Sequence, residues 1–437
     1  MFETLKNAFK VKEIRVKIWI TLLFVLIYRL GCYIPVPGIG GYLIDQAELD
    51  KVSYLNIMSM MSGGALAQGT WFAMGIGPYI NASIIIQLLA VAIPALERLS
   101  KQGEEGQKKI ANLTRIGALV LAILQSVGIL IAYGESAITT ANGARSMADL
   151  LGGQKWLCYI ILVVFYSSGS LITVWLGERI TENGVSNGIS ILIFVGILTT
   201  VGVQAVNMIG EIFSGNLVSL WKFIGFVAVI VVVFGLIVFV ELSERKIPVQ
   251  YAKQVKGRKM YGGQSTVIPI KVNATGVMPL IFAFSILSFP ELIGTMIDPN
   301  GGFVRWWQMW MGTDSWLYMV VLCLLILGFA YFYAMIQFNP EDISKTIQQN
   351  GGFIPGIRPG KPTADYLKKV QNRITLFGAI FLAFIALVPS ILFRTVLQTS
   401  SSVFSATGLI ICVSVALEFN TALESQIMMK NYKGFLK

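Results

Sequence analysis

Long apolar windows separated by polar segments dominate the pattern along this chain. Crossing about 30 Å of hydrocarbon takes about 20 mostly apolar residues in a helix. Ten windows of this kind are present, at residues 18–36, 71–93, 116–133, 155–175, 187–208, 223–240, 277–297, 316–338, 374–393 and 403–423. The pattern therefore predicts an all-α integral membrane protein with ten transmembrane helices.

The predicted spans divide into two sets of five at an outward-facing linker, residues 210–222. Because five is odd, the second set begins on the opposite side of the membrane, which is the topology of an inverted repeat. We see no convincing sequence identity between the sets, so an accidental five plus five stays open. We expect an N-terminal half at residues 1–209, a C-terminal half at 223–424 and a tail at 425–437.

One apolar segment, LNIMSMMSGGAL, is far too short to cross a membrane. It comprises Leu55, Asn56, Ile57, Met58, Ser59, Met60, Met61, Ser62, Gly63, Gly64, Ala65 and Leu66. A re-entrant segment is tolerated at membrane depth only where protein or water surrounds it. The alternative is an amphipathic helix lying on the outer membrane surface.

Composition excludes several classes of protein. The 437 residues are 55% hydrophobic and 13% charged, with a mean hydropathy of +0.70, whereas soluble domains carry about 25% charged residues. The chain contains no histidine, which excludes imidazole catalysis and histidine-ligated metals. Its four cysteines lie far apart in apolar segments, so we interpret them as small hydrophobic residues. We expect no cofactor and no metal.

The basic residues predict the orientation in the membrane, because Lys and Arg concentrate in cytosolic loops. Of 34 Lys and Arg, 27 lie in the N-terminal arm, the even-numbered loops and the tail, and six lie in the alternate loops. Both termini are therefore expected to be cytosolic, and no cleavable signal peptide is evident. The net charge of +11 is compatible with nucleic acid binding, but anionic lipid headgroups attract the same residues.

Charged residues are scarce inside the spans, where Arg29 is the only deep one. Secondary transporters normally hold ionisable residues near the bilayer midplane, so this scarcity disfavours a transporter. An intramembrane enzyme is disfavoured too, because no histidine, Ser-Lys or paired-Asp site is evident. The Gly360-Lys361 pair is no nucleotide loop, since Pro362 replaces the required Ser or Thr. Energy from ATP would have to come through a partner.

Several motifs resemble the SecY family, the channel subunits of the bacterial protein translocase. They are MSGGAL at residues 61–66, GIGPYINASIIIQLL at 75–89, WLGERITENGVSNGISI at 175–191, KVNATGVMP at 271–279, and FNPEDI with GGFIPGIRPGKPT in the loop at 339–373. This resemblance covers nearly the whole chain. It implies an hourglass-shaped channel, not an enzyme, whose halves hinge at the linker and part on the opposite side.

The resemblance also implies roles for particular residues. Ile76, Ile80, Ile193, Ile281 and Ile411 would form an apolar pore ring, with the neighbouring Ile410 as an alternative to Ile411. Residues 55–66 would be the plug. Asn81, Gln87, Asn273 and Phe289 match positions of a lateral gate between the second and third spans and the seventh and eighth. A hydrophobic constriction of this kind holds back ions by dewetting.

Finally, the resemblance implies partners. They are the small membrane subunits SecE and SecG, the motor ATPase SecA, the ribosome, precursors with signal sequences, and the lipid bilayer, in the bacterial cytoplasmic membrane. Docking would use Arg258 and Lys259 in the loop at residues 241–271, and Arg358 in the loop at 339–373. Basic residues suit rRNA phosphates and acidic protein surfaces equally. The family often has Arg at the position of Lys259, which weakens any argument from bidentate contacts.

Overall fold

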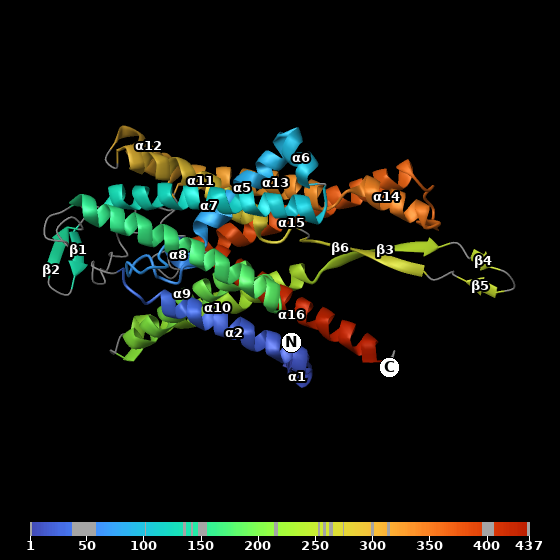
Figure 1. Ribbon diagram of the computed structural model, residues 1–437, viewed down its shortest axis with the longest axis horizontal. Helices are drawn as coiled ribbons and strands as arrows, with labels where there is room; N and C mark the ends of the chain where they lie inside the picture. The colour runs from blue at the N-terminus through green and yellow to red at the C-terminus, as the bar shows by residue number, and fades with distance from the viewer. Residues whose placement is uncertain are drawn as a thin grey trace.

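The computed structural model of this chain is a bundle of long helices (Figure 1). It describes residues 2–36, 58–100, 102–133, 137–140, 143–146, 155–213, 217–251, 254–256, 259–261, 265–273, 275–298, 301–312, 315–395 and 406–434. The helices are α1 (Phe2–Lys10), α2 (Lys12–Gly31), α5 (Gly77–Ala92), α6 (Pro94–Ser100), α7 (Glu104–Tyr133), α8 (Lys155–Asn183), α9 (Gly188–Phe213), α10 (Leu217–Glu241), α11 (Met278–Ile297), α12 (Gly302–Met311), α13 (Trp316–Gln337), α14 (Pro340–Gln349), α15 (Lys361–Thr395) and α16 (Ala406–Gly434). The strands are β1 (Ala137–Thr140), β2 (Gly143–Ser146), β3 (Glu244–Tyr251), β4 (Gln254–Lys256), β5 (Lys259–Tyr261), β6 (Ser265–Lys271) and β7 (Gly352–Phe353).

Each predicted span overlaps one long helix, and the order is the same. The helices concerned are α2, α5, α7, α8, α9, α10, α11, α13, α15 and α16. Within the described residues, eight helices are long and apolar enough to cross a membrane, and nine if the bent pair α5 and α6 is one span. Helix α2 is long enough to cross a membrane, but it contains too many charged residues to count among these helices. The helical membrane architecture is confirmed, while the count of ten spans stays a prediction.

The second span begins later than predicted. Residues 71–76 form turns and α5 starts at Gly77, because Gly75 has a φ of +50° and Pro78 occupies the first turn of the helix. At its other end α5 stops at Ala92, and α6 leaves it at an angle of 107° after Pro94. A proline cannot continue the hydrogen bonding of the preceding turn, which accounts for the break.

The loops gather at the two ends of the bundle (Figure 1). The β1–β2 hairpin and α12 lie at one end, and α14 with the long β3–β6 hairpin extends from the other, where the C-terminus also lies. Helix α1 packs against the end of α16, and the Thr4 hydroxyl donates to the Glu424 carboxylate at 3.1 Å. Three of the basic segments, with α14, the β3–β6 hairpin and the C-terminus, therefore lie at one end, and the cytosolic orientation of that end stays a prediction.

Two loops that look separate in the sequence form one folded unit, which we call the hairpin unit. Strand β3 pairs antiparallel with β6 on one side and with β7 on the other. Ile247, Val249 and Ile270 from the hairpin pack against Ile347 and Leu367 from α14 and α15. The apolar alternation along β3 was not recognised in the sequence, so the hairpin unit is an addition to the prediction.

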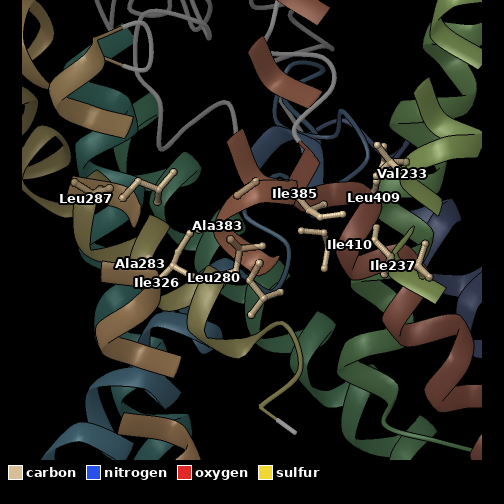
Figure 2. Packing of buried hydrophobic residues seen from close by; sticks show 14 of the residues in the cluster. Val233, Ile237, Leu280, Ala283, Leu287, Ile326, Ala383, Ile385, Leu409 and Ile410 are labelled. Atoms are coloured by element: carbon tan, nitrogen blue, oxygen red, sulfur yellow. The ribbon is translucent and has the colours of Figure 1, made fainter. Parts of the chain in front are cut away.

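The membrane part of the C-terminal half has its own apolar core. Figure 2 shows Val233 and Ile237 of α10 near Leu409 and Ile410 of α16, and Ile385 of α15 beside them. Leu280 and Ala283 of α11 and Ile326 of α13 complete the same cluster. Because lipid surrounds a membrane protein, the outer face stays apolar as well, and Phe239 of α10 is 73% exposed.

The hairpin unit depends on its core. Leu367→Ala should cost about 2 to 5 kcal/mol of local stability, because it removes a fully buried side chain and leaves a cavity. We expect faster amide hydrogen exchange in β3 and β6. Val267→Ala is the matched control, because Val267 is 45% exposed on β6. Equal exchange in both variants would contradict a shared core.

Candidate functional site

The five isoleucines predicted for the pore ring meet in the middle of the bundle. Ile76, Ile193 and Ile411 are buried in one apolar cluster, and the partly buried Ile80 and Ile281 pack against it. They come from α9, α11, α16 and the start of α5. We call these five residues the isoleucine cluster. Ile76 and Ile80 lie one helical turn apart, so both point to the same face.

The structure separates Ile411 from its neighbour Ile410. Ile410 is 1% exposed and belongs to the apolar core of the C-terminal half, near Ile385 in Figure 2. Ile411 instead joins the isoleucine cluster and lines the cavity described below. Successive residues of a helix point about 100° apart, which is why only one of them faces the centre.

The described part of the predicted plug, residues 58–66, lies against the isoleucine cluster, and residues 55–57 fall outside the described residues. A short helical turn at residues 58–61 is followed by Gly63 and Gly64 with φ values of +69° and +84°. These conformations favour glycine. The bend is held by two bonds to the Ser59 carbonyl, from the Gly64 N–H at 2.8 Å and the Ser62 hydroxyl at 3.1 Å.

Helix α9 is in close backbone contact with this segment, and we call Gly196 the seat of the segment. A Cβ on Gly196 would lie 1.9 Å from the Met61 carbonyl oxygen, so only glycine allows the two backbones to come this close. One turn further along, the Thr200 hydroxyl donates to the Met60 carbonyl at 3.1 Å. Sequence reasoning missed both residues. The glycine in an otherwise apolar helix was the available signal.

Little space is left between the segment and the cluster. A cavity of about 60 Å³ remains, enough for only a few water molecules. Its lining includes Met58, Met60 and Met61 from the segment, Ile80, Ile281 and Ile411 from the cluster, and Gly77, Asn81, Ile197, Phe284, Ser285, Ser288 and Gly408. The described residues therefore fill the centre of the bundle almost completely.

The predicted lateral gate coincides with a packed seam of α5 and α7 against α11 and α13. On this seam Ile84 of α5 meets Phe282 of α11 and Tyr333 of α13. The Tyr333 hydroxyl donates to the Gln87 side-chain oxygen at 2.9 Å, and Gln87 in turn donates to Ser83 at 3.0 Å. Because Gly128 of α7 has no side chain, Met296 of α11 can approach α7 closely.

The other residues predicted for the gate are less closely associated. Asn81 is buried and lines the central cavity, and Phe289 is half-buried on α11. The Asn273 amide donates to the Glu241 carboxylate at 2.9 Å, so its bond lies within the C-terminal half rather than across the seam. Tyr333, which sequence reasoning missed, makes a hydrogen bond across the seam.

The residues predicted for docking are only partly described. Arg258 lies outside the described residues, and Lys259 is the first residue of β5 at the tip of the hairpin. Arg358 is exposed in a turn, and its carbonyl accepts a bond from the Thr363 hydroxyl at 2.8 Å. Gly360 has a φ of +93° and its carbonyl accepts from Ser344 at 2.7 Å. These bonds connect the turn to α14 and to the first turn of α15, while the rigidity suggested by its Gly and Pro spacing stays a prediction.

Arg29, the deep charge noted in the sequence, lies beside the segment. A Cβ on Gly63 would lie 2.5 Å from its Nη1 atom, and Arg29 Nη2 donates to the Tyr33 hydroxyl at 3.4 Å. The guanidinium also lies 5.5 Å from the centre of the Tyr33 ring. Within the described residues, no group of three Cys, Asp or Glu side chains could hold a metal ion.

Known proteins resemble this chain along its whole length. A family model described as SecY matches residues 70–420. The protein translocase subunit SecY of Streptomyces coelicolor is 41% identical over 100% of both chains, and that of Mycobacterium tuberculosis is 38% identical, again over 100% of both. A solved structure described as a protein conducting channel has a TM-score of 0.65 at 18% identity, covering 95% of this chain and 92% of its own. Sec61 in the canine ribosome-channel complex has a TM-score of 0.62 at 17% identity, covering 94% and 92%.

The close approach at Gly196 generates a prediction. Gly196→Ala should displace residues 58–66, because the new Cβ would collide with a backbone oxygen that no side-chain rotation relieves. The readout is the rate at which a thiol reagent labels Ser62→Cys, located by mass spectrometry. Ser62 is 1% exposed, so labelling should be slow alone and several-fold faster with Gly196→Ala.

The control for this experiment is Gly202→Ala on the same helix. A Cβ on Gly202 would meet nothing within 4 Å, so labelling should stay slow. Equal labelling with the two alanines would show that Gly196 is not the seat of the segment.

Proposed function

This chain belongs to the SecY family, and from that premise we propose that it is the channel through which unfolded polypeptides cross the membrane. It is a channel subunit of a protein translocase and not an enzyme. Its membrane helices and its fold agree with this function. The same channel inserts membrane proteins by releasing apolar segments sideways into the bilayer.

The observation that carries the proposal is the isoleucine cluster with residues 58–66 packed against it. A pore that passes any polypeptide cannot depend on contacts with particular side chains. Branched apolar side chains form a constriction that adapts to a passing chain and dewets when nothing occupies it. We assign Ile76, Ile80, Ile193, Ile281 and Ile411 to this constriction and residues 55–66 to the plug that seals it.

We further propose that the two halves move as units. Residues 1–209 and 223–424 are the halves, the linker at 210–222 is the hinge, and 425–437 is a tail. Helices α9 and α10 extend into the linker from both sides, to Phe213 and from Leu217. The seam of α5 and α7 with α11 and α13 is the side that parts.

The lateral gate needs a weak closure. The hydrogen bond between Gln87 and Tyr333 across it is neutral and contributes about 1 kcal/mol net, beside the apolar contacts of the seam. Asn81, Asn273 and Phe289 belong to the same gate by the family resemblance. An apolar segment in the channel replaces these contacts with its own burial in lipid, so its hydrophobicity decides between crossing and release.

The proposed partners follow from the exposed basic segments and the family. We infer that the hairpin unit, with Arg258, Lys259 and Arg358, docks the ribosome or the motor ATPase SecA. Solved structures of similar fold include the canine ribosome-channel complex and a yeast Ssh1 complex bound to the 80S ribosome. SecE and SecG complete the translocase in the bacterial cytoplasmic membrane, with both termini of this chain in the cytosol.

Transport by the reconstituted chain tests the function. The full chain is placed in vesicles with SecE and SecG, and SecA, ATP and an unfolded secretory precursor are added outside. We expect the precursor to become protected from protease, because the channel moves it into the lumen. A precursor without its signal sequence and a sample without ATP are the controls. Absence of protection, or equal protection in the controls, would overturn the proposal.

Removing the cross-gate hydrogen bond should ease sideways release. Tyr333→Phe leaves Gln87 without its donor and weakens the closed gate by about 1 kcal/mol, about fivefold in the gating equilibrium. The measurement is the fraction of a test segment integrated into the membrane as its leucine content rises. We expect the midpoint to move to fewer leucines.

Tyr331→Phe is the matched control for the gate experiment. The Tyr331 hydroxyl is exposed and donates to the Asn372 carbonyl of α15 at 3.2 Å, away from the seam. Its loss should leave the midpoint unchanged. A shift of the same size in both variants would mean that the hydroxyl acts through helix stability and not through the gate.

A further inference from the structure

Helix α12 exposes an apolar side that the channel function does not use. Four of its large apolar side chains are between 46% and 74% exposed: Phe303, Trp306, Met309 and Trp310. Because a helix turns about 100° per residue, these positions share about one third of its circumference. We call these four residues the aromatic face. An exposed apolar patch of this kind marks a surface that binds protein or lipid.

The remaining sides of α12 have a different character. Val304 is buried, and Met311 packs against the apolar core of the C-terminal half. Arg305 and Gln308 are exposed and polar. The helix therefore has one side toward the protein, one polar side and one aromatic side. Amphipathic helices that lie in the plane of a membrane surface are divided in this way, whereas spanning helices are apolar all round.

Helix α12 is fixed to α11, a helix of the proposed gate. A Cβ on Gly294 of α11 would lie 2.8 Å from a ring carbon of Phe303 and 3.1 Å from a methyl carbon of Val304. Two residues further along α11, Met296 approaches Gly128 of α7 on the seam. Residues two apart in a helix point about 200° apart, so α11 has α12 on one side and the seam on the other.

The surfaces on both sides of the aromatic face indicate what covers it. Exposed apolar side chains form a stripe on α13, at Trp316, Val320 and Leu324, and Ile293 and Ile297 are exposed on α11. Both helices are long and apolar enough to cross a membrane, so these residues face hydrocarbon. Helix α12 joins the end of α11 to the start of α13, where hydrocarbon meets the headgroups. Tryptophan is enriched at that level of a bilayer.

The aromatic face is ordered by its own contacts. The ring centres of Phe303, Trp306 and Trp307 lie between 5.9 and 6.4 Å from one another. Aromatic rings at this separation attract each other. Their mutual packing holds the side chains in place before they meet a bilayer, so little conformational entropy is lost when they insert.

We propose that α12 is an interfacial anchor, whose aromatic face inserts into the lipid interface at the end of the bundle opposite the hairpin unit (Figure 1). The anchor fixes the depth of the adjoining ends of α11 and α13. Any motion of α11 that draws α12 out of the interface exposes the aromatic face to water, which is unfavourable. The anchor therefore adds to the free energy that holds the gate closed. This effect on the gate rests on the proposed function, whereas the anchoring does not.

A fluorescent probe at adjacent positions tests the anchoring. The four native cysteines are replaced by alanine, and Met309→Cys or Gln308→Cys is labelled with NBD in the full chain in phosphatidylcholine vesicles. Nitroxide near the start of the acyl chains should quench the probe at Met309→Cys several-fold more than the probe at Gln308→Cys. Iodide in the water should do the reverse. Equal iodide quenching at both positions would overturn the anchor. Protection of Met309→Cys from both quenchers would overturn it too, since a protein such as a second copy of this chain would then cover the face.

A pair of tryptophan substitutions tests the effect on the gate. Trp306→Gln combined with Trp310→Gln weakens the anchor, so the midpoint of integration of a test segment should move to fewer leucines. Trp156→Gln is the matched control, because Trp156 is an exposed tryptophan of α8, which packs on α7, α9 and α2. An unchanged midpoint in the double variant, or an equal shift in the control, would overturn the coupling to the gate. The double variant should still protect the secretory precursor, and absence of protection in the unsubstituted chain would count against the proposed function instead.

Discussion

The contact between residues 58–66 and the isoleucine cluster is the interaction on which the rest of this channel depends. In its proposed role it must exclude ions at rest and yield to any polypeptide, which apolar side chains can do without a charge pair. Apolar burial holds the methionines against the isoleucines, and backbone contact holds the segment to α9 at Gly196. Burial of this kind has no preferred direction, so the segment breaks few directional contacts on leaving, among them the hydrogen bond from Thr200 to Met60.

The seam and the hairpin unit are arranged around that contact. Helix α5 carries Ile80 to the centre and Gln87 to the seam, so the proposed constriction and the proposed gate share one helix. Helix α15 starts in the core of the hairpin unit at Leu367 and runs into the core of the C-terminal half at Leu382. A partner that moves the hairpin unit would therefore act on the membrane helices through a continuous helix.

The sequence predicted the membrane class, the order of the long helices and the sharing of one centre by distant isoleucines. The first two follow from hydropathy, because lipid requires long apolar helices whatever the function. The isoleucines came from motifs alone, since nothing in their spacing shows that four helices converge. Gly196 and Tyr333 were missed because a glycine in an apolar helix and a tyrosine at a helix end are ordinary in one dimension. The three-stranded sheet of the hairpin unit was missed because the alternation along β3 was not recognised and because β7 lies about 100 residues after β3.

The bond between Gln87 and Tyr333 has a consequence for how the proposed gate discriminates between polypeptide segments. The contribution of this bond, about 1 kcal/mol, is comparable with the membrane transfer free energy of two or three leucines, at about 0.3 to 0.6 kcal/mol each. Sorting on this scale is graded. Adding one leucine to a segment changes the fraction of molecules released sideways and does not switch all of them from crossing to release. A cell containing such a channel would produce mixed populations from borderline segments, and the precision of protein topology would rest on cargo sequences evolving away from that borderline.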